Sequence, residues 1–152
     1  IVSVACTSKN VARQAAKDRR VDLLSPCLAF PCKRFFDYAE AELASKKSVA
    51  FEIDMMLILS LTEFPRIRLL SSLRKEVAVA RKFDIPITIS SGASDENLLR
   101  SPHEYVALAT LFDFPESYAL QALSDHPLAI VERNKRKLSP FYIAPGMRIV
   151  EK

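Results

Sequence analysis

Short apolar runs alternate with stretches of helical pattern along the first 90 residues of this sequence. The apolar runs are Val2 to Cys6, Val21 to Ser25, Val49 to Ile53 and Pro86 to Ser90. Helical patterns fill the gaps between them, and in the longest, residues 66–83, apolar side chains recur along one face. Strands that alternate with helices in this way lie parallel and are joined by right-handed crossovers. The sequence therefore predicts an α/β fold with four parallel strands.

The later part of the chain is expected to be mainly helical. Pro102, Pro115 and Pro127 each begin an apolar stretch of helical spacing, and proline is favoured in the first turn of a helix. A turn is predicted at Pro145, followed by a short extended segment. With 152 residues, of which 49% are hydrophobic, the chain can bury a real core. We therefore expect one domain that spans 1–152.

Periodicity does not decide between a barrel and an open doubly wound sheet, but one detail favours a barrel. In the segment AFEID, which begins at Ala50, small or acidic residues alternate with Phe51 and Ile53. One face of this strand is therefore small and polar, and the other suits packing against helices. Polar inward positions at strand ends are where barrel proteins form their sites. The predicted architecture is a TIM-like barrel with a helix-rich second half.

Composition excludes several classes of function. Two glycines in the whole chain are too few for a glycine-rich phosphate loop or a dinucleotide-binding fingerprint. No apolar run reaches the roughly 18 residues that a membrane span needs, so a soluble protein without a membrane partner is expected. A formal net charge of +4 favours acidic partners only mildly. Because Cys6, Cys27 and Cys32 lack the clustering of a zinc site, we expect reduced, buried thiols in an intracellular protein.

The carboxyl ends of the predicted strands gather the polar side chains that could carry chemistry. These residues are Thr7, Ser25, Glu52, Asp54, Ser90 and Ser91. The two carboxylates could share a proton or hold Mg²⁺, but the only histidines are His103 and His126, and neither ends a strand. Pairing of Glu52 and Asp54 with Arg or Lys inside the barrel is therefore favoured over a metal site.

Ser90 and Ser91 are poor candidates for a nucleophile. They lack the Gly-x-Ser-x-Gly turn of hydrolases, and no histidine base is identifiable. Hydrogen bonding of the turn after the strand is the favoured role, with Gly92 relaxing the backbone and Ser94 or Asp95 capping the next turn.

Arginines near helix starts are the leading candidates for binding. Arg100 precedes Ser101 and Pro102, so it lies just outside a helix whose first turn offers free N–H groups. It could grip a phosphate or form a bidentate pair with a strand-end carboxylate, and both alternatives stay open. Arg66 and Arg68, at the start of the long helix, allow the same two interpretations.

Two further basic segments are interpreted by default as helix ends that are exposed to solvent. They are the pair Lys33 and Arg34 and the run that contains Arg133, Lys135 and Arg136. Cations at a helix C-terminus are favourable against the helix dipole. However, no acidic residue interrupts the second run, so contact with phosphate is more plausible there than for scattered lysines.

Four blocks of this sequence resemble a known family, the archaeal and eukaryotic ribonuclease P protein subunit of the p-thirty type, called component three in archaea. VDLLSP (Val21 to Pro26) is similar to a family strand that ends in Ser-Pro, and AFEI (Ala50 to Ile53) to its Phe-Glu strand. Arg66 or Arg68 matches an arginine that opens the next helix. The most specific block is SSGA (Ser90 to Ala93) followed by LRSP (Leu99 to Pro102).

The resemblance covers essentially the whole chain and implies the C-terminal part of a TIM-like barrel related to metal-dependent phosphoesterases. The strands that the family has before the equivalent of Ile1 are absent, so the chain is expected to be trimmed and to leave a strand edge for another segment or chain to cover. The family has no recognised active site of its own, and the resemblance implies no cofactor and no metal.

What the resemblance implies for function is an accessory role. The RNA subunit removes the 5′ leader from precursor tRNA, and this protein pairs with a small ferredoxin-like subunit of the Pop-five type and supports the RNA. The implied location is the cytoplasm in an archaeon and the nucleus or nucleolus in a eukaryote. A mildly basic surface that holds phosphates by charge fits such a role without contributing a reacting group.

The sequence therefore predicts a non-catalytic, RNA-binding subunit of ribonuclease P, with Arg66, Arg68 and Arg100 as the leading functional residues. Ser25, Glu52, Ser90 and Ser91 are assigned to a structural site at the strand ends. Two alternatives remain. One is a metal-dependent phosphoesterase-like barrel that uses Glu52 and Asp54, and the other is a barrel whose work is protein assembly alone.

Overall fold

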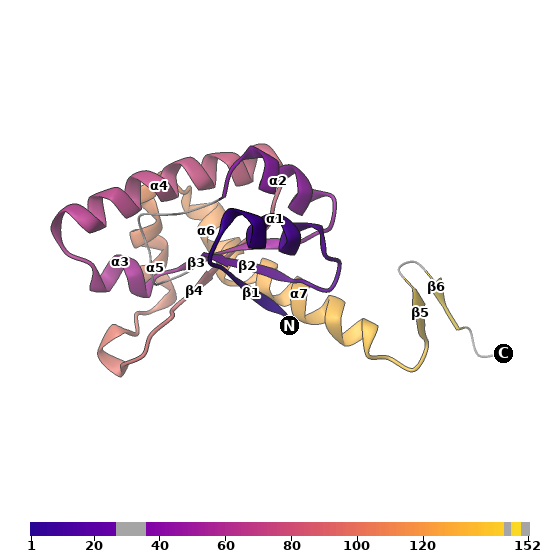
Figure 1. Ribbon diagram of the computed structural model, residues 1–152. Helices are drawn as coiled ribbons and strands as arrows, with labels where there is room; N and C mark the ends of the chain where they lie inside the picture. Colours follow the sequence, from indigo (N-terminus) through magenta and orange to yellow (C-terminus); the bar gives the residue numbers. More distant parts are fainter. Residues whose placement is uncertain (27–35, 145–146, 150–152) are drawn as a thin grey trace.

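A four-stranded parallel sheet forms the centre of the molecule. The computed structural model describes residues 1–26, 36–144 and 147–149. The strands are β1 (Ser3–Cys6), β2 (Leu23–Pro26), β3 (Ala50–Asp54) and β4 (Ile87–Ser90). They lie in the order β1-β2-β3-β4, so β1 and β4 are the two edges (Figure 1). The predicted α/β class with parallel strands is confirmed, whereas closure into a barrel stays a prediction because the described strands form an open sheet.

Helices connect each strand to the next. The connecting helices are α1 (Lys9–Lys17), α2 (Tyr38–Ser45), α3 (Met56–Ser60) and α4 (Glu63–Lys82). Figure 1 shows α1, α2 and α4 together on one side of the strands. Ser8 caps α1 by accepting a hydrogen bond from the N–H of Val11.

The apolar face of the sheet packs against these helices and forms the core. Phe51 and Ile53 of β3 are each about 1% exposed, as the alternation in AFEID predicts. Phe36 packs on Phe51 with 4.3 Å between the ring centroids. From α4, Leu69 and Leu73 are equally buried in the same cluster. Burial of each such side chain contributes on the order of 2 kcal/mol, so this layer holds α4 against the sheet.

The opposite face of the sheet is polar, and its exposure falls from β1 to β4. Ala5 of β1 is exposed, Ser25 and Glu52 are half-buried, and Thr88 of β4 is buried. In register, Ala5 lies beside Ser25, and Glu52 lies beside Thr88. The outer edge of β1 and the adjoining polar face are therefore the least covered part of the sheet.

The second half is helical, as predicted. Its elements are η1 (Glu96–Leu98), α5 (Pro102–Ala109), η2 (Thr110–Phe112), α6 (Glu116–Leu123) and α7 (Asp125–Lys137), followed by a hairpin of β5 (Tyr142–Ala144) and β6 (Met147–Arg148). Figure 1 shows α7 on the side of the sheet away from α4, with the hairpin projecting beyond its end. Within the described residues, no helix is both long enough and apolar enough to cross a membrane.

Several boundaries differ from those expected. The short helix α3 was not predicted, and α4 begins three residues earlier than expected because Pro65 is tolerated in its first turn. Helix α7 likewise begins at Asp125, two residues before Pro127. The strand β5 was missed, and the turn predicted at Pro145 lies outside the described residues.

His126 of α7 covers part of the outer edge of β4. The carbonyls of Pro86 and Ser90 accept hydrogen bonds from β3 or the residue after it, so the carbonyl of Ile87 points away from the sheet. His126 Nδ1 lies 2.6 Å from the Ile87 oxygen. Because a carbonyl only accepts, the imidazole must donate from Nδ1. One edge of the sheet is thus partly occupied by a helix.

An ion pair between a buried aspartate and a half-buried arginine ties α7 to the amino ends of β2 and β3. Arg133 donates from Nη2 to Asp22 Oδ1 at 2.8 Å and from Nη1 to the carbonyl of Ser48 at 2.6 Å. Asp22 is 1% exposed and also accepts the N–H of Val2 at 2.9 Å. Burial by itself raises the pKa of Asp22, but interactions with the Val2 N–H, the Asn134 side chain and Arg133 together outweigh it, so the pKa lies below its usual value.

Replacing Arg133 by methionine is expected to destabilise the fold by about 3 kcal/mol, because the buried Asp22 carboxylate loses its cation. Arg136→Met is the matched control, since Arg136 makes an exposed pair with Glu132 on the same helix and its loss should cost under about 1 kcal/mol. Urea unfolding of both variants measures the difference. Equal losses in the free energy of unfolding would show that the pair with Asp22 stabilises the fold no more than the exposed pair does.

The effect of Arg133→Met should also depend on pH. The folded-state pKa of Asp22 is lowered, so its stabilisation is present above the unfolded-state pKa of about 3.9 and is lost as pH falls through the folded value. The difference in Tm between wild type and Arg133→Met is therefore expected to hold from pH 7 to about pH 4 and to shrink as the pH falls further. Thermal melts at several pH values on both sides of about pH 4 test this, and a difference that stays constant below about pH 4 would contradict it.

Candidate functional site

Polar residues from three strands lie at one end of the sheet. Glu52 and Asp54 belong to β3, Ser90 ends β4, and Ser91 follows it directly. Asp54 lies beside Ser90 in the register, and all four side chains are half-buried. Ser25 occupies the corresponding end of β2. The structure thus places these predicted strand-end residues together at the carboxyl end of the sheet.

The Asp54 side chain accepts a backbone hydrogen bond at this end of the sheet. Its Oδ1 atom accepts the N–H of Met56 at 2.8 Å, which helps to start α3, while Met55 donates to the carbonyl of Ser90 at 3.0 Å. Gly92 has a φ of +55° and lies directly over the Asp54 carboxylate, where any Cβ would overlap it. The loop after β4 is therefore closed down onto Asp54, which explains the glycine.

The loop continues to Arg100, whose guanidinium ties it together. Arg100 Nη1 donates to the carbonyls of Asn97 at 2.7 Å and Leu99 at 2.8 Å, and its N–H donates to Tyr105 Oη at 3.2 Å. Asp95 caps η1 by accepting the N–H of Asn97 at 2.7 Å, as predicted for one of two residues. In the described structure Arg100 makes no ion pair with a carboxylate at the strand ends, and it remains exposed.

The entrance of α5 is fixed by a capping box. Ser101 Oγ accepts the N–H of Glu104, and Glu104 Oε2 accepts the N–H of Ser101 at 2.7 Å. The pKa of Glu104 is lowered first by that backbone hydrogen bond, then by the Ser101 hydroxyl and the nearby charge of Arg100. Pro102 occupies the first turn, as predicted. The LRSP block thus sets where Arg100 emerges from the surface.

Arg66 and Arg68 have different surroundings. Arg66 donates from Nε to the carbonyl of Leu61 at 2.5 Å and from Nη2 to that of Leu59 at 3.5 Å, so it caps the end of α3. Arg68 is exposed and forms no hydrogen bond or ion pair with any described residue. Of the two, Arg68 has the guanidinium that is available to a ligand.

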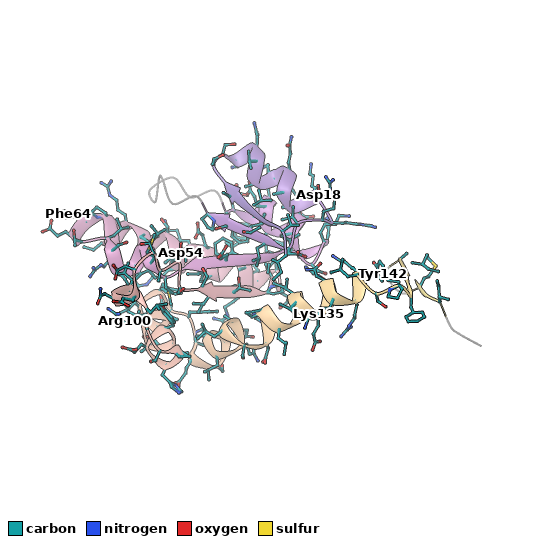
Figure 2. All side chains as sticks on the ribbon, turned by 90° about the horizontal axis from the view of Figure 1, so that it is seen from below. Asp18, Asp54, Phe64, Arg100, Lys135 and Tyr142 are labelled. Carbon is teal, nitrogen blue, oxygen red and sulfur yellow. The ribbon has the colours of Figure 1, made fainter. Side chains whose placement is uncertain are left out.

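The other basic candidates are more scattered. Arg133 is held by Asp22 and Ser48, and Arg136 pairs with Glu132 at 3.3 Å, while Lys135 is exposed. The pair Lys33 and Arg34 lies outside the described residues, as do Cys27 and Cys32. Figure 2 labels Arg100 and Lys135 at distant places on the molecule, so these two cations do not belong to one patch.

The strand-end residues do not assemble a metal-binding cluster in the described ranges. No group of three or more His, Cys, Asp or Glu side chains there is placed to hold an ion. Glu52 makes no ion pair with a described residue, and Thr88 beside it has a buried hydroxyl without a described partner. No observation on these residues favours the phosphoesterase alternative.

Sequence reasoning missed four cations on α4. They are Arg74, Lys75, Arg81 and Lys82. Two of them lie against tyrosines of other elements: Arg81 over Tyr118 of α6 and Lys82 over Tyr38 of α2. The seven-residue spacing from Arg68 to Lys75 to Lys82 is visible in the sequence and places these three on one line of the helix. This spacing is the sequence pattern from which the row of cations on α4 could have been predicted.

Fold and site together define an α/β protein with a parallel sheet, in which the Asp54 carboxylate at a strand end holds the start of the next helix. The family described as RNase P subunit p30 matches residues 1–139, so the chain belongs to this family. Ribonuclease P protein component 3 of Methanosarcina barkeri is 35% identical over 144 residues, covering 95% of this chain and 59% of the relative. The corresponding protein of Methanococcoides burtonii is 30% identical over 151 residues, covering 99% of this chain and 61% of the relative.

The fold also matches a solved structure. A chain in the cryo-EM structure of archaeal ribonuclease P with mature tRNA has a TM-score of 0.85 and 25% sequence identity, and the match covers all of this chain and 65% of that one. The suspected family is therefore confirmed. The present chain spans about three fifths of the length of the relatives that it matches.

Gly92→Ala should destabilise the loop over Asp54, because alanine is strained at positive φ and its methyl group would overlap the carboxylate. We expect a loss of about 2 kcal/mol in the free energy of unfolding. Ser94→Ala, two residues later on an exposed position, is the control and should change stability by less than about 0.5 kcal/mol. Denaturant titration of the two variants makes the comparison, and an unaffected Gly92→Ala would contradict the close approach.

Proposed function

We propose that this chain is part of a protein subunit of ribonuclease P, which binds and supports the catalytic RNA during removal of the 5′ leader from precursor tRNA. The observation that carries the proposal is membership of the RNase P subunit p30 family over residues 1–139. The likeness to a chain in archaeal ribonuclease P with mature tRNA supports RNA and tRNA as partners. Because the chain spans about three fifths of its relatives, the activity of the whole protein belongs to this proposal.

The geometry supports a binding role rather than a chemical one. Asp54 is engaged by the backbone of Met56, and the Arg100 side chain holds two carbonyls while its charge stays exposed. Exposed cations on well-anchored loops and helices can hold phosphates without taking part in bond breaking. In this role Arg68 and Arg100 would contact RNA, and Arg66 would position the start of α4.

The proposal extends to the complete fold and its partners. The β1 edge and the polar face beside it are the least covered part of the sheet, and the relatives have additional length that could supply further strands. Such strands would extend the sheet toward the TIM-like barrel expected from the resemblance. A small ferredoxin-like subunit would be the protein partner, and the cytoplasm would be the location in an archaeon.

Reconstitution tests the proposed function. This chain, ribonuclease P RNA and the small ferredoxin-like subunit would be combined with precursor tRNA, and release of the 5′ leader would be measured. We expect faster cleavage with this chain than without it at a magnesium concentration where the RNA alone is slow. If the chain neither speeds cleavage nor binds the RNA, the proposal is wrong.

Arg100→Ala should weaken RNA binding and processing, because a phosphate contact is lost. Arg100→Lys is the companion variant, since it keeps the charge but replaces the planar group that holds two carbonyls. Retention of the salt slope by Arg100→Lys and its decrease by about 1 in Arg100→Ala would support the phosphate role. If both variants bind RNA like wild type but melt at lower temperature, Arg100 serves only its own loop.

A further inference from the structure

The net charge of this protein is concentrated on one helix. Helix α4 contains six Arg or Lys residues and two Glu residues, a balance of +4 that equals the formal net charge of the whole chain. One of those glutamates, Glu76, is buried, so the exposed side of the helix is more basic than the balance suggests. The remainder of the chain is neutral overall.

The cations of α4 lie in two rows on its outer side. At 100° per residue, Arg68, Lys75 and Lys82 fall on one line, and Arg74 and Arg81 fall on a second. We call these five side chains the α4 ridge. The helix buries the other side through Leu69, Leu73, Glu76, Val77 and Ala80, so both rows point away from the core. Figure 1 shows α4 along the margin of the molecule.

Little in the described structure neutralises the ridge. Arg68 and Lys75 make no ion pair with a described residue. Arg74 pairs with Asp113 at 3.2 Å, but both side chains are more than half exposed, and exposed pairs of this kind contribute little and exchange readily. A polyanion could therefore replace Asp113 without a large cost.

Two tyrosines hold the C-terminal cations of the ridge without cancelling their charge. The guanidinium of Arg81 lies 4.9 Å from the centre of the Tyr118 ring, and Lys82 Nζ lies 5.0 Å from that of Tyr38. Both rings are themselves exposed. Because the rings flank the helix from α6 and α2, they orient the cations and also offer flat surfaces on which bases could stack.

We propose that the α4 ridge is an interface for the phosphate backbone of RNA, through Arg68, Arg74, Lys75, Arg81 and Lys82. This inference rests on the proposed function, because the RNA would be that of ribonuclease P. RNA fits better than an acidic protein. Protein interfaces have an apolar centre depleted of lysine, whereas the residues between the two rows, Ser71 and Ala78, are small and exposed. Three of the five cations are arginines, whose planar group suits phosphate oxygens.

Binding of the double variant Arg68→Gln/Lys75→Gln to ribonuclease P RNA of Methanosarcina barkeri tests the proposal by fluorescence anisotropy. Both residues are exposed and without described partners, so the fold should be unchanged by circular dichroism. The affinity is expected to fall on the order of tenfold, and the slope of log K against log salt to decrease by about 1.5, for two lost phosphate contacts. Lys17→Gln/Arg19→Gln is the matched control, because it removes one lysine and one arginine from exposed positions outside α4.

Each outcome has a distinct meaning. A loss in the α4 variant with an unchanged control supports the ridge. Equal losses of affinity in both variants would show that only total charge matters, and would overturn the proposed role of the ridge. Wild-type affinity in the α4 variant would also overturn that role, but the protein would still be an RNA-binding protein. Intact RNA binding together with lost association with the small ferredoxin-like subunit would assign the ridge to a protein. No binding of RNA by wild type would overturn the proposed function itself.

Discussion

Burial of one side of α4 against the sheet is the contact on which the rest of this structure depends. Leu69, Leu73 and Val77 are each almost fully buried in the cluster that contains Phe51 and Ile53. This packing keeps the strands covered on their apolar face, and it also leaves the helix no rotational freedom. The charged side of α4 is therefore directed outward by the same contacts that form the core. Stability and the presentation of charge have one cause here.

The strands and most helices could be predicted from the sequence, because their signals are local. Alternation in AFEID gives both the strand and its two faces, and prolines mark the first turns of α5 and α7. Helix α3 could not be found in this way. It has five residues, all but Ser60 apolar, and it is started by the carboxylate of Asp54 at the end of the preceding strand. The pair of Asp22 and Arg133 joins residues 111 positions apart, and no local pattern indicates it.

The candidate site was harder to predict than the fold, because its side chains choose among several partners. Arg100 was correctly located beside a capped helix entrance, yet its guanidinium bonds to carbonyls of its own loop rather than to a carboxylate. Backbone acceptors of this kind are not visible in a sequence. The α4 ridge was overlooked for a related reason. Its cations are regularly spaced in the sequence, but Tyr38 and Tyr118 reach them only after the chain has folded.

The unequal distribution of charge has a consequence for how this protein meets other molecules. Helix α4 carries an excess of four positive charges on one side of the sheet, while the remaining residues sum to zero. The attraction of a polyanion therefore acts most strongly on this helix, which favours encounters in which α4 faces the partner. Diffusional encounters then begin in nearly the right orientation, and the rate of association becomes sensitive to ionic strength beyond what the final contacts require.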